Sequence, residues 1–258
     1  MVAPNDDLCV IDKTGRIQRL SPDGECLAVW NVPDALNGTP TGGAFDRNGD
    51  LVMADTHYSR ILRFAADGTS WTQFGRYGKG PAEMIYPTDV AVDADGNIYV
   101  TNHGGRNKVM KFRGDGTFVK EWGDTGDGPG QFQRPMALAL LGDDEIVVAD
   151  TCNHRIQRFD RDGRFVAMWG GVGQAKGRLN YPYDVEAGPK GAIYVCEYGN
   201  NRVSKFTREG RFVATLGGPG SDPGRFRGPW GLALDQTGRL YVADTYNHRV
   251  QRFAAGVL

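Results

Sequence analysis

Short apolar runs alternate with polar turns along the whole chain, and no segment has the residue spacing of an amphipathic helix. The clearest unit spans residues 135–169. Two apolar runs, residues 135–141 and 146–149, are separated by a Gly-Asp-Asp turn. Residues 155–159 then alternate between apolar and polar with a period of two, and residues 165–169 follow a second glycine-containing turn. This pattern predicts four short antiparallel β-strands.

The same unit recurs at a nearly constant interval. The turn between its second and third strands reads ADTHYSRILRF, TNHGGRNKVMKF, ADTCNHRIQRF, CEYGNNRVSKF and ADTYNHRVQRF, and VIDKTGRIQRL is a degenerate further copy. The acidic or amide residues that anchor these turns are Asp12, Asp55, Asn102, Asp150, Glu197 and Asp244, and the last five lie 47 or 48 residues apart. A period in this range is typical of an array of one supersecondary unit.

Six repeats of four strands predict an all-β fold, a six-bladed β-propeller of four-stranded antiparallel blades. The first and last blades are expected to be incomplete, because the first retains only a stub of its inner strand, residues 1–3, and the chain ends soon after Phe253. We expect residues 1–258 to form a single propeller domain. Its blades are predicted at residues 1–31, 40–75, 87–123, 135–170, 182–217 and 229–258.

Apolar side chains recur at one position of the loops that join the blades. Each stands three residues before a proline that opens the next blade: Met84, Phe132, Leu179 and Phe226. We predict that they are wedges packed between adjacent blades, because a stripe of this kind is far more often core than part of a cofactor site.

The turn motifs closely resemble the signature of the NHL repeat family, over about residues 8 to 253. The residues that carry the resemblance are Asn153-His154-Arg155 and Asn247-His248-Arg249, with the weaker Asn200-Asn201-Arg202. The resemblance implies a six-bladed propeller in which the recurring Asp and Arg are structural. An Asp and an Arg that flank one tight turn would satisfy each other's partly buried charge. We therefore expect the ion pairs Asp55–Arg60, Asp150–Arg155 and Asp244–Arg249.

The composition and net charge of the chain exclude few classes of function. The formal net charge is −1 and apolar residues make up 40% of the chain, so the totals indicate neither nucleic-acid nor anionic-membrane binding. No stretch approaches the roughly 20 apolar residues of a membrane span, and we expect a monomer without membrane insertion. The N-terminus has no signal-peptide core, which favours the cytoplasm if Met1 is the native start. An excised domain would leave a periplasmic or extracellular origin open.

The catalytic residues of one related enzyme class are not matched. Residues 87–92 are similar in type to a blade of the peptidylglycine amidating lyases, which use channel histidines on zinc and a turn tyrosine. After its blade-opening prolines this chain has Thr88, Met136, Tyr183 and Trp230 in place of His, and the turn expected to carry the tyrosine reads His103-Gly104-Gly105. The four histidines lie in turns of four different blades, which is unsuitable for one zinc ion. The sequence therefore leans against an enzyme.

A cation site is the second enzymatic hypothesis. Calcium-dependent lactonases, another class of six-bladed propellers, need several carboxylates and an Asn that converge on the central channel. The starts of the inner strands offer only Asp89 and Asp184. These two carboxylates are candidate ligands for Ca²⁺ or another divalent cation in the channel, and the alternative is that they cap backbone groups at its mouth. No other cofactor is expected.

The loops between the blades carry the candidate binding residues. Residues 76–86, 124–134, 171–181 and 218–228 contain seven basic and four acidic residues, a net charge of +3. Tyr86 and Tyr181 lie near the predicted channel mouth. Aromatic residues with Arg have the composition of interface hot spots, which predicts a scaffold that binds a protein or peptide. The candidate contacts are Arg134, Tyr183, Arg227 and Trp230. Single-stranded RNA, stacked on the aromatic rings, is a second alternative ligand.

Overall fold

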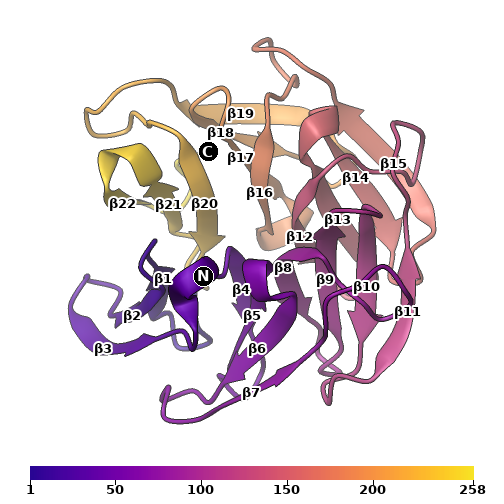
Figure 1. Ribbon diagram of the computed structural model, residues 1–258. Helices are drawn as coiled ribbons and strands as arrows, with labels where there is room; N and C mark the ends of the chain where they lie inside the picture. The colour runs from indigo at the N-terminus through magenta and orange to yellow at the C-terminus, as the bar shows by residue number, and fades with distance from the viewer. The chain divides into compact units, whose positions relative to one another are not determined.

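The computed structural model describes residues 1–258 and consists of β-strands, turns and five short 3₁₀ helices. Its strands form six antiparallel sheets in chain order, four of four strands and two of three (Figure 1). The three-stranded sheets are the first and the last. The expected fold class, an all-β six-bladed propeller with incomplete first and last blades, is therefore confirmed.

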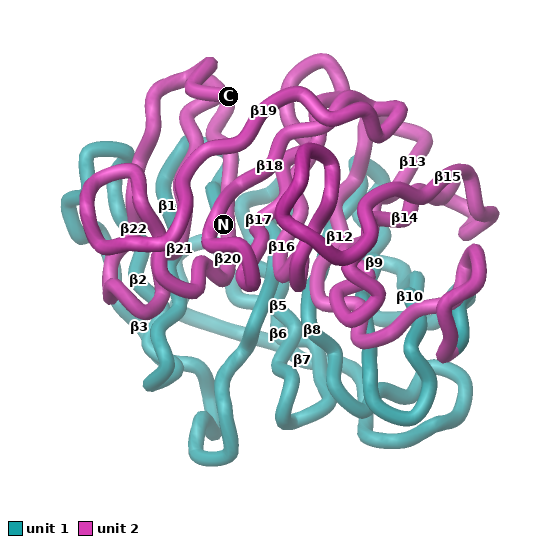
Figure 2. The backbone as a smooth tube through the Cα atoms, turned by 90° about the horizontal axis from the view of Figure 1, so that it is seen from above, with its two compact units in different colours: residues 1–124 teal, residues 125–258 magenta.

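The chain divides into two compact units, residues 1–124 and 125–258 (Figure 2). The first unit contains the first three sheets. They are formed by β1 (Leu8–Ile11), β2 (Arg16–Leu20) and β3 (Cys26–Asn31); by β4 (Gly42–Phe45), β5 (Leu51–Asp55), β6 (Arg60–Phe64) and β7 (Trp71–Phe74); and by β8 (Tyr86–Val92), β9 (Ile98–His103), β10 (Lys108–Phe112) and β11 (Phe118–Trp122). The helices η1 (Ala35–Asn37) and η2 (Thr56–Tyr58) lie in its turns, and Val2 forms an isolated bridge with Leu8 at the stub of the first inner strand.

The second unit contains the other three sheets. They are formed by β12 (Pro135–Leu141), β13 (Glu145–Asp150), β14 (Arg155–Asp160) and β15 (Phe165–Gly170); by β16 (Pro182–Ala187), β17 (Ile193–Glu197), β18 (Arg202–Phe206) and β19 (Phe212–Gly217); and by β20 (Pro229–Leu234), β21 (Leu240–Asp244) and β22 (Arg249–Phe253). Its turns contain η3 (Thr151–Asn153), η4 (Pro189–Gly191) and η5 (Thr245–Asn247). None of the helices in residues 1–258 has the length and apolar character needed to cross a bilayer.

The core of each unit lies between neighbouring sheets, and the predicted wedges are part of it. Met84 packs in the cluster that joins the second and third sheets, Leu179 in that of the fourth and fifth, and Phe226 in that of the fifth and sixth. Phe132 contacts Phe159 of the fourth sheet, with ring centroids 5.6 Å apart. All four wedge side chains are fully buried, which confirms the prediction that they are core rather than a cofactor site.

The backbone conformation at the signature position explains why histidine is found there. His154 and His248 directly follow η3 and η5 and have φ values of 53°, in the left-handed region. Ser59 and Asn201 adopt the same conformation in the equivalent turns, with φ values of 55° and 52°. Asn and His are among the non-glycine residues most often found there. The position therefore selects residues that tolerate this conformation, which agrees with the interpretation of these histidines as turn residues.

Candidate binding site

Ion pairs at the second-to-third strand turns anchor the framework of the site. The Arg Nε lies 2.7–2.8 Å from the carboxylate in the pairs Asp55–Arg60, Asp150–Arg155 and Asp244–Arg249, as predicted, and also in Glu197–Arg202. The four carboxylates are completely buried. The third sheet departs from the pattern. There Asn102 Oδ1 accepts a hydrogen bond from the Ile85 amide at 2.9 Å, and Lys108 pairs with Glu121 at 2.7 Å.

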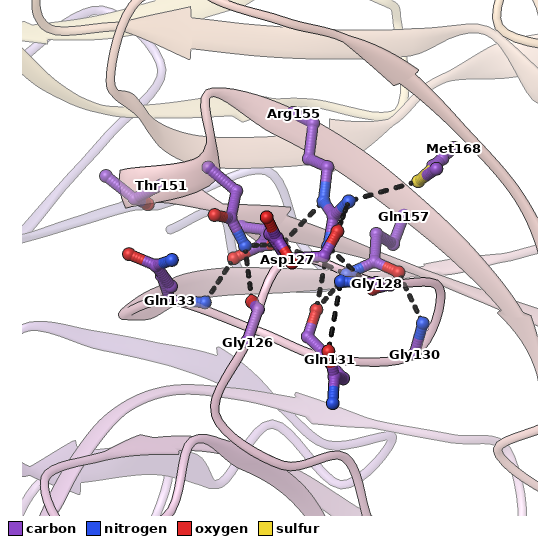
Figure 3. A network of polar contacts seen from close by, with 12 residues as sticks. Gly126, Asp127, Gly128, Gly130, Gln131, Gln133, Thr151, Arg155, Gln157 and Met168 are labelled. Carbon is purple, nitrogen blue, oxygen red and sulfur yellow. Dashed lines mark hydrogen bonds and ion pairs between the residues drawn. The ribbon is translucent and has the colours of Figure 1, made fainter.

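The same turn residues hold the preceding loop by its main chain, most completely around Arg155 (Figure 3). The Arg155 guanidinium donates to the carbonyl oxygens of Asp127, Gly128 and Gln131 at 2.6–2.9 Å. The Asp150 carboxylate accepts hydrogen bonds from the Gln133 amide and from three side chains, Asn153, Arg155 and Gln157. These contacts fix the path of residues 125–134 and so the position of Arg134.

Equivalent contacts hold the next two loops. In the fifth sheet, Arg202 donates to the carbonyl oxygens of Gln174 and Arg178 at 2.8 Å. In the sixth, Arg249 donates to those of Asp222 and Arg225, and Asn247 to that of Gly220 at 3.0 Å. The three loops of the second unit are thus held by one repeated network. A binding surface built on them is preorganised, which lowers the entropic cost of binding.

Four aromatic side chains gather at the end of the fifth and sixth sheets where these loops lie. We call Tyr183, Tyr198, Trp230 and Tyr246 the aromatic cluster. The Tyr183 and Tyr198 rings are stacked, with centroids 4.6 Å apart and an interplanar angle of 13°. Trp230 packs edge-on against Tyr183 at 5.1 Å and Tyr198 at 6.2 Å, and Tyr246 packs edge-on against Tyr198. All four keep part of their surface exposed, so the cluster is a surface feature rather than core.

Two tyrosine hydroxyls of the aromatic cluster are linked. The Tyr198 and Tyr246 hydroxyl oxygens lie 3.2 Å apart, and either is able to donate. This hydrogen bond is the main cause that raises the pKa of Tyr198 to about 12. Burial raises the pKa of Tyr183, and the nearby Arg134 charge partly opposes this. The phenols of Tyr183 and Tyr198 therefore stay protonated at neutral pH and are able to donate hydrogen bonds to a ligand.

The structure brings together some of the residues predicted from the sequence. Tyr183 contacts Trp230, and Arg134 lies within electrostatic reach of Tyr183. Arg227 borders the aromatic cluster through its main chain, because its carbonyl accepts a hydrogen bond from the Tyr246 amide at 3.0 Å. The Arg134 and Arg227 side chains are exposed. Arg134 directly precedes its blade-opening proline, whereas Arg227 is one residue further back.

Sequence reasoning missed Tyr198 and Tyr246, which lie in the β17–β18 and β21–β22 turns. Each falls at a different offset from the anchoring acid of its turn, so alignment of the repeats does not pair them. A further signal is Gly228, which occupies the place that Arg134 and Tyr181 hold in their loops. A side chain at position 228 would collide with Tyr246 and approach Tyr198. The glycine therefore makes room for the aromatic cluster.

A smaller aromatic group lies in the first unit. Tyr86 contacts His103 at 5.2 Å between ring centroids and His57 at 6.3 Å. In the second unit Tyr181 packs on His154 at 4.5 Å, and its amide donates to His154 Nδ1 at 3.0 Å. Burial lowers the pKa of His154. These histidines thus pack against loop tyrosines.

The candidate metal ligands Asp89 and Asp184 belong to different units. Asp184 accepts backbone hydrogen bonds from Val185 at 2.8 Å and from Leu232 of the neighbouring strand β20 at 2.7 Å. Asp89 is buried and approaches Gly42 so closely that a side chain there would collide with it. No three His, Cys, Asp or Glu side chains in residues 1–258 form a group suited to hold a metal ion. The cation site thus stays a prediction.

Glu186 adds a second acid beside Asp184, and the sequence did not single it out. The two residues are separated by one position in β16 and so project from the same side of the strand. Both keep some solvent contact but are crowded by protein. This desolvation is the largest cause that raises the pKa of Asp184 to about 6 and the pKa of Glu186 to about 8, and the Asp184 charge raises the latter further.

Two protein families match the sequence of this chain. The model of the SMP-30/gluconolactonase/LRE-like region matches residues 3–224, which is most of the chain. The chain belongs to this family. The NHL repeat model matches residues 226–253, the segment with the Asn247-His248 signature. Together with the six sheets, the two matches confirm the interpretation of the chain as an NHL-repeat-type six-bladed propeller.

Solved structures share the fold of this SMP-30/gluconolactonase-like chain at low sequence identity. A nidogen/laminin complex matches with a TM-score of 0.76 and 18% identity, over 97% of this chain and 90% of that chain. A gluconolactonase from Xanthomonas campestris matches with a TM-score of 0.70 and 21% identity, over 92% and 79%. A streptogramin B lyase matches with a TM-score of 0.68 and 17% identity, over 98% and 76%. These likenesses establish the fold and no activity.

One curated relative is similar in sequence over a short segment. The protein brain tumor of Drosophila melanogaster is 40% identical over 63 residues. That segment is 24% of this chain and 6% of the Drosophila protein. The likeness thus concerns a small part of a much longer chain.

Proposed function

We propose that this protein is a non-catalytic binding module that presents the aromatic cluster to a protein or peptide partner. The observation that carries the proposal is the gathering of Tyr183, Tyr198, Trp230 and Tyr246 beside loops that the main-chain network holds in place. Tyr and Trp provide large rigid contact areas at a low entropic cost. Together with Arg they form the composition found at the energetic centres of protein interfaces.

The charge around the aromatic cluster favours a partner segment with acidic and apolar residues. Arg134 lies near Tyr183, Arg227 borders the cluster through its main chain, and both arginine side chains are exposed. The protonated tyrosine hydroxyls are donors that match carboxylate or carbonyl oxygens. Single-stranded RNA offers a different match to the same rings, but a dedicated RNA-binding surface is expected to be more basic than a chain with a net charge of −1. A protein or peptide segment is therefore the favoured ligand.

Selection from a random displayed-peptide library on the purified protein tests the proposal. We expect the enriched peptides to lose affinity by at least about 2 kcal/mol, roughly 30-fold, with Trp230→Ala, because truncation of a central aromatic anchor removes a hot spot. Trp71→Ala is the matched control, since Trp71 is an exposed tryptophan of β7 outside the aromatic cluster. Affinity is measured by titration calorimetry.

Two outcomes would contradict the proposal. The first is a set of selected peptides that bind Trp230→Ala and Trp71→Ala equally well. The second is the absence of peptide binding together with tight, steeply salt-dependent binding of single-stranded oligouridine that Trp230→Ala removes. This result would assign the aromatic cluster to RNA.

A second candidate function is that of a metal-dependent enzyme of the gluconolactonase or lyase type. Family membership and the Asp184–Glu186 pair on β16 support it. Carboxylates are the ligands that Ca²⁺ prefers, and a bound divalent cation polarises a carbonyl oxygen of a substrate. Asp184 and Glu186 would hold the cation.

Thermal unfolding with added metal tests this candidate. If Asp184 is a ligand, 5 mM Ca²⁺ or Zn²⁺ is expected to raise the Tm by roughly 5–10 °C, as about 2–3 kcal/mol of linkage predicts at 100 times the Kd. Asp184→Asn should remove the increase, and Asp143→Asn, at an exposed turn acid, should retain it. Equal metal responses in the two variants would argue against a role for Asp184.

A further inference from the structure

A pocket of about 240 Å³ opens to solvent between the second and third sheets, within the first unit. Its walls are aromatic and apolar, with Phe74 from the end of β7, Phe112 and Phe118 from the β10–β11 hairpin, and Ala82 from the loop between the sheets. The ring centroids of Phe74 and Phe112 are 5.2 Å apart. Drug-sized ligands occupy pockets of about 300–1,000 Å³, so this pocket suits one small ring system.

The position of Phe74 recurs in every outer strand. Phe74 lies opposite Ile61, the second residue of β6. In the other four outer strands the same register position holds Trp30, Trp122, Trp169 and Leu216. Leu216 packs in one cluster with the bulky wedge Phe226, whereas the wedge in the cluster of Phe74 is the slender Met84. Phe74 therefore marks the junction where a tryptophan is missing and no larger wedge replaces it.

Two of these tryptophans show how the missing volume is filled elsewhere. The Trp169 ring lies against Gly210 of the β18–β19 turn, where any side chain would collide with it. Trp30 is packed in the same way at the junction of the first and second sheets. Phe74 lies against the equivalent glycine, Gly116, but has one ring where tryptophan has two. The space of the second ring is left as the pocket.

The wall of the pocket contains a strained residue. Ala82 has a φ value of 62°, in the left-handed region. The equivalent residues of the other three loops between blades are Gly130, Gly177 and Gly224, with φ values of 77–79°. A Cβ atom is disfavoured in this conformation because it crowds the following carbonyl oxygen. Such strain is found most often at functional sites, and here it adds a methyl group to the apolar wall.

Arg76 adds a positive charge to the edge of the pocket. Its Nε lies 3.0 Å from one Glu83 carboxylate oxygen, and its side chain is 78% exposed. The Gly80 amide donates to the other Glu83 oxygen at 2.8 Å, which lowers the pKa of this carboxyl. Glu83 thus holds the guanidinium at one nitrogen and leaves the two terminal nitrogens for a ligand. Arg76 and Lys79 outweigh Glu83 among the charged residues of 76–86, so the loop attracts anions.

We propose that this pocket binds a small planar aromatic carboxylate. The ring system lies between the phenylalanine side chains, in the space that the second ring of a tryptophan fills at other junctions. Aromatic rings contact each other favourably in offset-stacked and edge-to-face arrangements. The carboxylate pairs with the terminal nitrogens of Arg76, because the planar guanidinium fork matches carboxylate geometry. The pocket shares no residue with the aromatic cluster and adds a ligand site to the function proposed above.

Indole-3-acetate is the probe, because its ring system is that of the missing tryptophan. We expect it to bind the purified protein at one site with a Kd of about 1 mM or below, as measured by titration calorimetry. Phe74→Trp should weaken binding at least about tenfold, because the new ring occupies the pocket. It should not lower the Tm, since three other outer strands carry tryptophan at this position. Phe165→Trp, the same change at an exposed phenylalanine of β15, is the matched control and should leave binding unchanged.

Uncharged indole tests the role of the carboxylate. Arg76→Gln should weaken indole-3-acetate roughly three- to fivefold, the range of an exposed ion pair, and leave the binding of indole unchanged. Arg47→Gln, at an exposed arginine of the β4–β5 turn, should affect neither compound.

Three results overturn the proposal: no saturable binding of indole-3-acetate, equal binding by Phe74→Trp, or equal binding by Arg76→Gln. Tighter binding of indole than of indole-3-acetate would also contradict it and would assign the pocket to an uncharged ring. Trp230→Ala is expected to leave the binding of indole-3-acetate intact. The outcome is therefore independent of the function proposed for the aromatic cluster.

Discussion

Replacing Asp150 by alanine is expected to lower the free energy of unfolding by about 3–5 kcal/mol. The carboxylate is completely buried and accepts hydrogen bonds at 2.7–3.0 Å from the Gln133 amide and from the side chains of Asn153, Arg155 and Gln157. Burial raises the pKa of Asp150 despite these partners, so the carboxylate is held at a cost in desolvation. Its removal leaves the nearly buried Arg155 guanidinium without its counter-charge, and this is the dominant penalty.

Urea unfolding of matched variants measures the effect. Asp143→Ala, at a turn acid whose side chain is 95% exposed in the same sheet, should change the unfolding free energy by less than about 0.5 kcal/mol. The double variant Asp150→Ala/Arg155→Ala should be less destabilised than the sum of the single variants, because it leaves no unpaired charge. Strict additivity would show that the ion pair is not the cause.

Replacing Glu186 by glutamine is expected to make the protein more stable at high pH, by roughly 2–4 kcal/mol at pH 9. Desolvation raises the pKa of Glu186 from its ordinary 4.5 to about 8 in the folded state. Between these two values the folded chain holds a proton that the unfolded chain releases, so stability falls as the pH rises. Above pH 8 the folded state bears a charge in a desolvated place. Glutamine removes this charge and has nearly the same shape.

Unfolding curves from pH 5 to pH 9 distinguish this linkage from a simple gain in packing. The difference between Glu186→Gln and the wild type should be small at pH 5, grow up to about pH 8 and level off above it. The exposed Glu209 provides the control, since Glu209→Gln should leave the dependence of stability on pH nearly unchanged. A constant difference at every pH would rule out a raised pKa at Glu186.

The propeller fold could be predicted from the sequence because the residues that determine it recur at equivalent positions of the repeats. The interval between the anchoring residues, the wedges and the pairs such as Asp55–Arg60 each recur, and recurrence separates structural requirements from chance. The third sheet shows the limit of this reasoning. Asn102 and Lys108 occupy the places of the acid and the arginine, yet Lys108 finds its carboxylate in Glu121 of the outer strand.

Only half of the aromatic cluster could be predicted from the sequence, because only two of its four residues occupy equivalent positions of the repeats. Tyr183 and Trp230 share one offset after a proline, and this made them visible. Tyr198 and Tyr246 come from turns with different offsets and meet only through packing across two sheets. The pairing of Glu186 with Asp184 also went unrecognised, because its significance comes from desolvation, which depends on neighbouring strands and not on local sequence.

The contacts that hold the loops of the second unit have an evolutionary consequence. Arg155, Arg202 and Arg249 reach the loops through carbonyl oxygens, a group that every amino acid carries. The loop side chains that point outward are therefore free to diversify without loss of the loop path. Side chains determine what the loops recognise, whereas main-chain contacts determine the path of the loops. Related chains are therefore able to change ligands while they keep the same fold. The same separation makes the outward-facing side chains of residues 125–134, 171–181 and 218–228 suitable positions for new specificities.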